Sequence, residues 1–272
     1  MLNITTTSRP GGDKPNEDWA GCTNELVVVL DGLSTPEGVG GCHHGTPWYV
    51  EHLGEQLLAR GSASTSLSLR EALRSSIEHV ASEHRATCDL ANPGTPSSTV
   101  ALIRSREDRL ETLVLADSPV VVDTATGIKV FTDQRVDQVV QRERDAVLSA
   151  PAGSEEKQER LAALVRVQQQ IRNTEGGYWV AQADGIAADH ALESSWAIDT
   201  VHRFAAMTDG VSCLVELYQD MSWNGLLDMA GGRGVSAVVD RIRQIEASDP
   251  CGTHWPRYKE GDDATLAYGQ LV

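Results

Sequence analysis

Short apolar runs separated by turn signals recur along this chain, and they restrict its fold more than any other feature of the sequence. The runs that we predict to be strands cover residues 26–30, 98–105, 110–118, 119–124, 128–133, 203–210 and 264–271. Several links between them are of hairpin length, such as "ATG" at 125–127. Because links this short join neighbouring antiparallel strands, we expect antiparallel sheets.

Amphipathic segments stand between the groups of predicted strands. Apolar residues recur at helical spacing over residues 46–61, 68–88, 154–173 and 234–248. Ser68, followed three residues later by Glu71, predicts a capping box at the start of the second segment. Helices that separate groups of antiparallel strands indicate an α+β class, and we expect a single domain over residues 1–272.

The charge of the chain limits its partners. Asp and Glu number 39 against 23 Lys and Arg, which gives a formal net charge of -16. A chain this acidic repels phosphate backbones and shows no basic patch, so we expect no nucleic-acid partner. It has no apolar run of membrane-spanning length and no signal-peptide pattern, so we expect no membrane partner and a cytoplasmic location.

The cysteines are scattered. They are Cys22, Cys42, Cys88, Cys213 and Cys251. An odd number of cysteines without a CxxC pair is typical of reduced thiols in a cytoplasmic protein. The same pattern leads us to expect no structural zinc site.

Carboxylates recur at the ends of the apolar runs. Asp31, Asp117, Asp209 and Asp262 follow or precede such runs, and Glu17 and Asp18 stand before the first of them. Two interpretations stay open on this evidence. Asp-Gly pairs are turn signals, whereas repeated aspartates suit Mg²⁺ or Mn²⁺, which prefer oxygen ligands. The second interpretation requires that these strand ends meet at one edge of the sheets.

The order of these segments carries a resemblance. The chain reads "NED" at 16–18, "VVVLDG" at 27–32, "SSTVALI" at 97–103, "LVLADS" at 113–118, "FAAMTDG" at 204–210 and "GDDATLAYG" at 261–269. In this order the segments resemble those of the metal-dependent protein phosphatase (PPM) family, the type 2C serine/threonine phosphatases. The resemblance implies a four-layer αββα sandwich in one PPM-type domain. It also implies that two mainly antiparallel sheets are flanked by helices and that a variable flap lies around residues 134–200.

The resemblance also implies a centre of two Mn²⁺ or Mg²⁺ ions, with a third, weaker site. The implied ligands are Glu17, Asp18, Asp31, Gly32, Asp117, Asp209 and Asp262. Asp31 would bridge both ions, and the carbonyl oxygen of Gly32 would bind one of them. Asp117 would share the third ion with Asp209. A metal-activated water would then attack the phosphorus atom.

The sequence departs from the family pattern at two places. The family's "DGHGG" is "DGLSTPEG" here, so a histidine that is a candidate general acid is missing. We assign that role to His44, with His43 as the alternative, although a structural role for either histidine stays open. The family's substrate-binding arginine is also missing, and we assign the phosphate contact to Lys14. A lysine is a point charge and lacks the planar fork of an arginine.

Three functions stay open at this stage. The leading one is a phosphatase for phosphoserine and phosphothreonine in proteins. The others are a phosphatase for a small phosphorylated metabolite and a catalytically silent protein that binds a phosphorylated partner. The segment "CGTHWPRYKEGDD" brings basic and aromatic residues before Asp262, and it is either a border of the active cleft or a solvated connecting loop.

Overall fold

Strands and helices alternate through the computed structural model, which describes residues 2–33, 40–62, 66–151 and 153–271. The strands are β1 (Leu2–Arg9), β2 (Asp18–Cys22), β3 (Leu26–Asp31), β4 (Val100–Arg106), β5 (Arg109–Leu115), β6 (Val120–Thr124), β7 (Gly127–Phe131), β8 (Leu192–Ala197), β9 (Val201–Met207) and β10 (Ala264–Leu271). The α-helices are α1 (Gly45–Gly61), α2 (Leu69–His84), α3 (Arg135–Val139), α4 (Gln141–Ser149), α5 (Glu155–Ile171), α6 (Asp209–Glu216), α7 (Trp223–Arg233) and α8 (Val235–Ser248). Short 3-10 helices, η1 (Gly185–His190) and η2 (Ile198–Thr200), flank β8.

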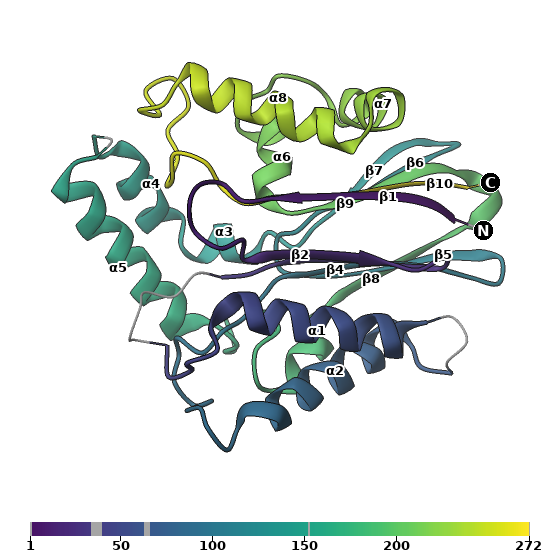
Figure 1. Ribbon diagram of the computed structural model, residues 1–272, viewed down its shortest axis with the longest axis horizontal. Coiled ribbons are helices and arrows are strands. Elements are labelled where there is room, and N and C mark those ends of the chain that lie inside the picture. The colour runs from purple at the N-terminus through teal and green to yellow at the C-terminus, as the bar shows by residue number, and fades with distance from the viewer. Residues whose placement is uncertain (1, 34–39, 63–65, 152, 272) are drawn as a thin grey trace.

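The strands form two five-stranded sheets. Their orders are β1-β10-β9-β6-β7 and β2-β3-β4-β5-β8, and every neighbouring pair is antiparallel. Helices α1 and α2 cover the outer face of the second sheet, and α6, α7 and α8 cover that of the first (Figure 1). Helices α4 and α5 stand at one end of the sandwich. The predicted α+β class and the four-layer αββα arrangement are therefore confirmed.

Strand β3 shows why the second sheet is anchored at this place. Val27 and Val29 join the apolar core between the two sheets, whereas Val28 and Leu30 join the core beneath α1 and α2. Because both faces of β3 are buried, its sequence is a continuous apolar run rather than an alternating one. The strand is thus fixed on both sides up to its last residue, Asp31.

Several predicted elements match the structure closely, and others are missing from the prediction. The hairpin of β6 and β7 and the strand β10 are where the sequence places them. The predicted capping box of Ser68 and Glu71 is present at the start of α2. Strands β1, β2 and β8 and helices α3, α4, α6 and α7 were not predicted. The prediction was also wrong to continue β9 through residues 208–210, because α6 begins at Asp209.

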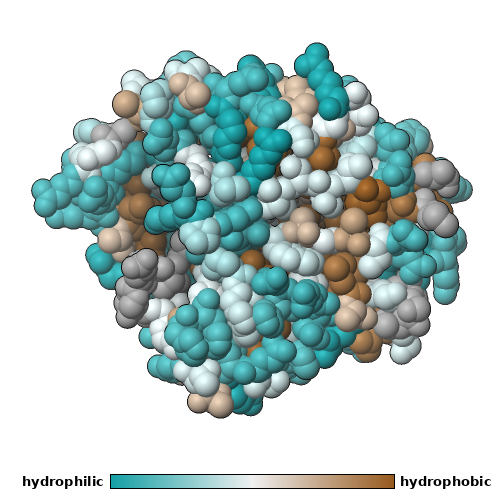
Figure 2. Space-filling model, in the orientation of Figure 1, coloured by the Kyte–Doolittle hydropathy of each residue, from teal (hydrophilic) through white to brown (hydrophobic). Residues whose placement is uncertain are grey.

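The surface agrees with the composition. The face seen in Figure 2 is largely hydrophilic, with apolar side chains gathered in smaller groups between polar ones. This distribution fits a chain whose formal net charge is -16. Among the described residues, no helix has both the length and the apolar character needed to cross a membrane.

Candidate metal centre

Asp31 lies at the end of β3, opposite Asp18 at the start of β2, because the antiparallel register pairs these residues. The backbone N–H of Asp31 donates to Oγ1 of Thr99 at 3.2 Å. The N–H of Thr99 donates in turn to the carbonyl oxygen of Asp31 at 2.9 Å. The backbone that carries the Asp31 carboxylate is therefore held by the chain on both sides of β3.

Gly32 lies where a side chain does not fit. A Cβ atom at this residue would be 2.3 Å from the carbonyl oxygen of Glu17 and 2.4 Å from Cγ2 of Thr46 in α1. The N–H of Gly32 donates to the same Glu17 carbonyl at 3.1 Å. The first Asp-Gly pair is therefore not a hairpin turn, since the next element is α1. Its glycine lets the end of β3 approach the chain before β2 and the start of α1.

The second Asp-Gly pair opens α6 and also marks a close approach. A Cβ atom on Gly210 would be 1.8 Å from the carbonyl oxygen of Asp263. The first turn of α6 therefore packs directly on the segment that leads into β10. This contact brings Asp209 near Asp262, whose charge acts on the Asp209 carboxyl.

Asp263 and Thr208 join the two sheets around these carboxylates. The carboxylate of Asp263 accepts hydrogen bonds from the backbone N–H of Gly11 at 2.8 Å and of Glu17 at 2.7 Å. Oγ1 of Thr208 donates to Oδ2 of Asp18 at 2.9 Å. Neither residue was assigned a role from the sequence, and the doubled aspartate of "GDD" was the one available signal. Both residues position the proposed ligands that surround them.

The pKa values show how closely the carboxyl groups are packed. Burial raises the pKa of Asp31 well above its usual value, and the charges of Asp209 and Asp18 raise it further. Asp262 and Asp117 act on Asp31 in the same direction. Burial and the charge of Asp262 raise the pKa of Asp209 to about 6. Burial and the charge of Asp209 raise the pKa of Asp117 to about 7. The aspartates from both sheets thus repel one another, as ligands do before cations bind.

Lys259 offsets part of this negative charge. Its Nζ lies 2.6 Å from Oδ1 of Asp262. Although burial lowers the pKa of Lys259, the charges of Asp262, Asp31 and Asp209 raise it above its usual value, so the side chain stays protonated. This contact favours the interpretation of residues 251–263 as a border of the centre. One ammonium group balances one carboxylate, which leaves the remaining negative charge to divalent cations.

The other residues that the sequence singled out lie around this centre or apart from it. Asp117 follows β5, and the charge of Asp137 in α3 reaches it. Lys14 is exposed in the loop between β1 and β2. His44 precedes α1, and its ring contacts Cys42, Cys88 and Trp48. The roles assigned to Lys14 and His44 stay predictions. Residues 34–39, which hold most of the altered "DGLSTPEG" loop, lie outside the described residues.

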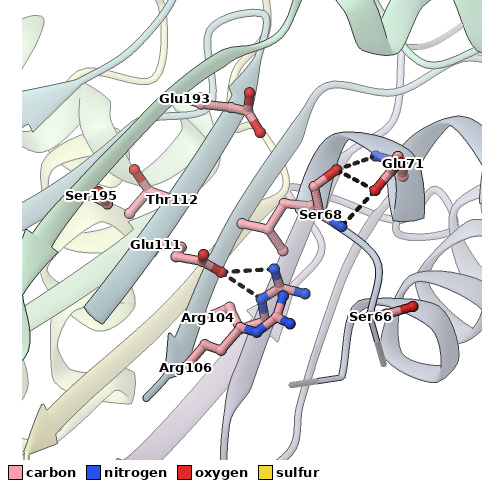
Figure 3. Close-up of a pocket in the computed structure, with 10 residues that line it drawn as sticks. Ser66, Ser68, Glu71, Arg104, Arg106, Glu111, Thr112, Glu193 and Ser195 are labelled. Atoms are coloured by element: carbon pink, nitrogen blue, oxygen red, sulfur yellow. Dashed lines mark hydrogen bonds and ion pairs between the residues drawn. The ribbon is translucent and has the colours of Figure 1, made fainter. Parts of the chain in front are cut away.

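A pocket of about 330 Å³ lies at the other end of the second sheet. Arg104 and Glu111 form an ion pair of 2.7 Å beside it (Figure 3). Arg104 pairs with Leu26, at the start of β3, whereas the carboxylates gather at its end. Ser68 and Glu71, which also line the pocket, bond to one another in the capping box. The polar groups named here are paired within the protein, so this pocket is not the candidate active site.

Comparisons with known proteins agree with this geometry. The profile of the protein phosphatase 2C family matches residues 7–244, whereas a comparison with curated protein sequences gives no match. The fold resembles that of PppA, a regulatory component of T6SS in Pseudomonas aeruginosa, with 16% identity and a TM-score of 0.58 over 100% of this chain and 98% of that one. It also resembles the serine/threonine phosphatase Stp1 from Staphylococcus aureus, with 15% identity and a TM-score of 0.59 over 100% of this chain and 96% of that one.

A third similar structure is a catalytic domain with ions bound. It is that of the serine threonine protein phosphatase PstP, in complex with 2 manganese ions. Identity is 15% and the TM-score is 0.57, over 100% of this chain and 98% of that one. At identities this low, these three likenesses show a shared fold.

Proposed function

The chain belongs to the protein phosphatase 2C family, and from this premise we propose that it removes phosphate from phosphoserine and phosphothreonine in proteins. The observation that carries the proposal is the meeting of Asp31 with Asp209 and Asp262. These residues come from different sheets, and each acts on the charge of another. A set of buried oxygen donors with raised pKa values is a typical functional site.

The donor set fits Mn²⁺ or Mg²⁺, which take carboxylate, carbonyl and water oxygens. Asp31 would bridge two ions, with the Gly32 carbonyl, Glu17 and Asp18 on one side. Asp209 and Asp262 would complete the other site, and Asp117 with Asp209 would hold a weaker third ion. When bound, such ions lower the pKa of a coordinated water and offset the charge of the phosphate group. The ions found in the PstP structure support this assignment.

The substrate would enter between the centre and helices α3 to α5. These helices make up most of the predicted flap around residues 134–200, although β8 within that range belongs to the second sheet. Asp137 in α3 and Arg144 in α4 interact electrostatically with Asp117, so the segment borders the centre. Lys14, exposed beside it in sequence to Glu17, is the proposed contact for the substrate phosphate. We extend the proposal to one PPM-type domain in the cytoplasm.

The first test is hydrolysis of p-nitrophenyl phosphate and of phosphopeptides with Mn²⁺, with Mg²⁺ and with no divalent ion. We expect metal-dependent turnover by the wild-type protein. Asp31→Asn and Asp209→Asn should each lower it by on the order of 100-fold or more, because each removes a ligand charge from the centre. Asp228→Asn is the matched control, because Asp228 is an exposed aspartate of α7.

The outcomes separate the three functions that the sequence left open. Faster release from phosphopeptides than from small phosphoesters would support the proposal, and the reverse order would favour a metabolite phosphatase. Binding of Mn²⁺ without turnover of either substrate would favour a silent phospho-binding protein. Full activity in Asp31→Asn would contradict the metal assignment itself.

A further inference from the structure

Two cysteines and two histidines lie together at the end of the α1–α2 layer, apart from the carboxylates. Cys42 and His44 precede α1, His84 is the last residue of α2, and Cys88 follows α2. One ligand atom from each of these four residues lies within 4.8 Å of the others. Among the described residues, this is the group of His, Cys, Asp and Glu side chains that could hold a metal ion as it stands.

The distances between the ligand atoms are those of a small tetrahedral site. Sγ of Cys42 lies 3.5 Å from Nδ1 of His44 and 3.4 Å from Nδ1 of His84. Sγ of Cys88 lies 3.3 Å from Nδ1 of His44 and 3.1 Å from Sγ of Cys42. Zinc bonds of about 2.3 Å to sulfur and about 2.0 Å to nitrogen place tetrahedral ligands about 3.3–3.8 Å apart. An ion would therefore require the two sulfur atoms to separate by roughly 0.6 Å, with little other movement.

The backbone around the cluster holds these side chains in place. The N–H of Cys88 donates to the carbonyl oxygen of His84 at 2.9 Å, which turns the chain back over the end of α2. The N–H of Asp89 donates to the carbonyl oxygen of Gly41 at 2.8 Å and joins the two loops that carry the cysteines. The ring of His44 stacks on Trp48 with 4.4 Å between centroids. The donors are thus oriented by the fold before any ion binds.

His84 shows that the cluster is a built site rather than a chance meeting at the surface. The residue is 1% exposed, and its ring packs 5.0 Å from Trp48. Its Nδ1 faces the sulfur of Cys42, and its Nε2 has no hydrogen-bond partner within the described part of the chain. Burying an imidazole is costly unless its polar atoms are used, and a metal bond at Nδ1 would use the nitrogen that faces the cluster.

We propose that Cys42, His44, His84 and Cys88 bind one Zn²⁺ ion in a closed structural site. Thiolate and imidazole ligands select zinc over Mg²⁺ or Mn²⁺, which prefer oxygen. Four protein ligands leave no open position for substrate or water, as in structural zinc sites. This proposal replaces the expectation that the chain has no structural zinc. It also gives His44 a ligand role in place of the predicted role as general acid.

The site has a structural consequence for the carboxylate centre. Thr46 lies two residues after His44, and its Cγ2 is close to Gly32. Oγ1 of Thr46 also donates to the carbonyl oxygen of Leu33 at 3.4 Å. An ion that fixes the start of α1 to the end of α2 therefore also fixes the backbone beside Asp31. The zinc ligands act on the carboxylates through this contact, as positioning residues.

The test is the metal content of protein produced with zinc and kept reduced. After gel filtration we expect one zinc per chain by mass spectrometry. Replacement by Co²⁺ should give the strong visible absorption and the sulfur-to-metal charge-transfer band of tetrahedral thiolate coordination. Cys42→Ser and Cys88→Ser should lose both the zinc and these bands. Cys22→Ser and Cys251→Ser are the matched controls, because both residues are exposed, and they should keep one zinc.

Further measurements keep the test decisive if a ligand variant fails to fold. In the wild-type protein, a mercurial reagent that blocks thiols should release one zinc, detected with a chromogenic chelator. His43→Ala should keep its zinc, although Nδ1 of His43 lies 3.7 Å from Sγ of Cys88. Asp31→Asn should also keep one zinc, so this result does not depend on the phosphatase activity. Wild-type protein without zinc, zinc retained in Cys42→Ser and Cys88→Ser, or a Cys42–Cys88 disulfide in place of the ion would overturn the proposal.

Discussion

Gly210 follows Asp209 at the start of α6 and lies against the backbone of Asp263. Because a Cβ atom there would be 1.8 Å from the Asp263 carbonyl oxygen, Gly210→Ala must push α6 away from the segment before β10. We expect the free energy of unfolding to fall by about 1–3 kcal/mol, as for other overpacked sites. The affinity for Mn²⁺ should also fall, because Asp209 and Asp262 move apart. Urea denaturation and a Mn²⁺ titration of activity measure the two effects.

Gly232→Ala is the control for this substitution. Gly232 lies in α7, and nothing lies within 4 Å of a Cβ atom placed there. Alanine suits a helix better than glycine, so stability should rise by at most about 1 kcal/mol. Equal effects of the two substitutions would show that the contact between Gly210 and Asp263 does not position Asp209.

At the residue scale, the sequence allows the charged ligands to be predicted better than the residues that hold them. Asp31 and Asp209 stand out because each follows a buried apolar strand. Asp263 and Thr208 do not, since their roles depend on bonds to Glu17 and Asp18, which are distant in sequence. The cysteine–histidine cluster was missed for the same reason, because it combines a Cys-x-His pair with a distant His-x-x-x-Cys pair.

At the element scale, the strands that the sequence did not predict share a position. Strands β1, β2 and β8 are all edge strands of their sheets. An edge strand buries less of its surface, so its sequence lacks a continuous apolar run, as "LESSWA" in the partly exposed β8 shows. The central strands β3, β4, β9 and β10 carry apolar runs because both of their faces are covered. Burial, and not strand formation itself, is what the apolar pattern reports.

The start of α2 offers a test of an element that the sequence did predict. Oγ of Ser68 accepts a hydrogen bond from the N–H of Glu71, and the Glu71 carboxylate accepts one from the N–H of Ser68. We expect Ser68→Ala to lower the free energy of unfolding by about 1 kcal/mol, because it leaves the N–H of Glu71 without this acceptor. Urea denaturation with an unchanged m-value measures the loss.

Ser82→Ala on the same helix is the matched control. The hydroxyl of Ser82 bonds only within its own turn, to the carbonyl oxygen of His79. This substitution should therefore change stability by no more than about 0.5 kcal/mol. A loss in Ser82→Ala as large as that in Ser68→Ala would mean that the capping box contributes nothing of its own.

At the scale of the whole molecule, the two sheets are held together beside a set of mutually repelling carboxylates. In protein without added divalent ions, the pKa of Asp209 is raised to about 6 and that of Asp117 to about 7. The unfolded chain loses these protons near the ordinary aspartate pKa of about 4. The folded state therefore binds more protons than the unfolded state between about pH 4 and pH 7. Stability should fall as the pH rises through this window.

Divalent ions should reverse this trend, because they bind ionised carboxylates and bind them only in the folded state. At 100 times its dissociation constant, Mn²⁺ would stabilise the protein by about 3 kcal/mol, which corresponds to a rise in Tm on the order of 5–10 °C. This rise should be larger at pH 8 than at pH 5, where protons compete for the ligands. Calorimetry at both pH values measures it. Gel filtration rather than a chelator should remove the Mn²⁺, because a chelator would also remove zinc from the cysteine–histidine cluster. In Asp31→Asn the Mn²⁺-dependent rise should be much smaller at both pH values, and an undiminished rise would place the stabilising ion elsewhere.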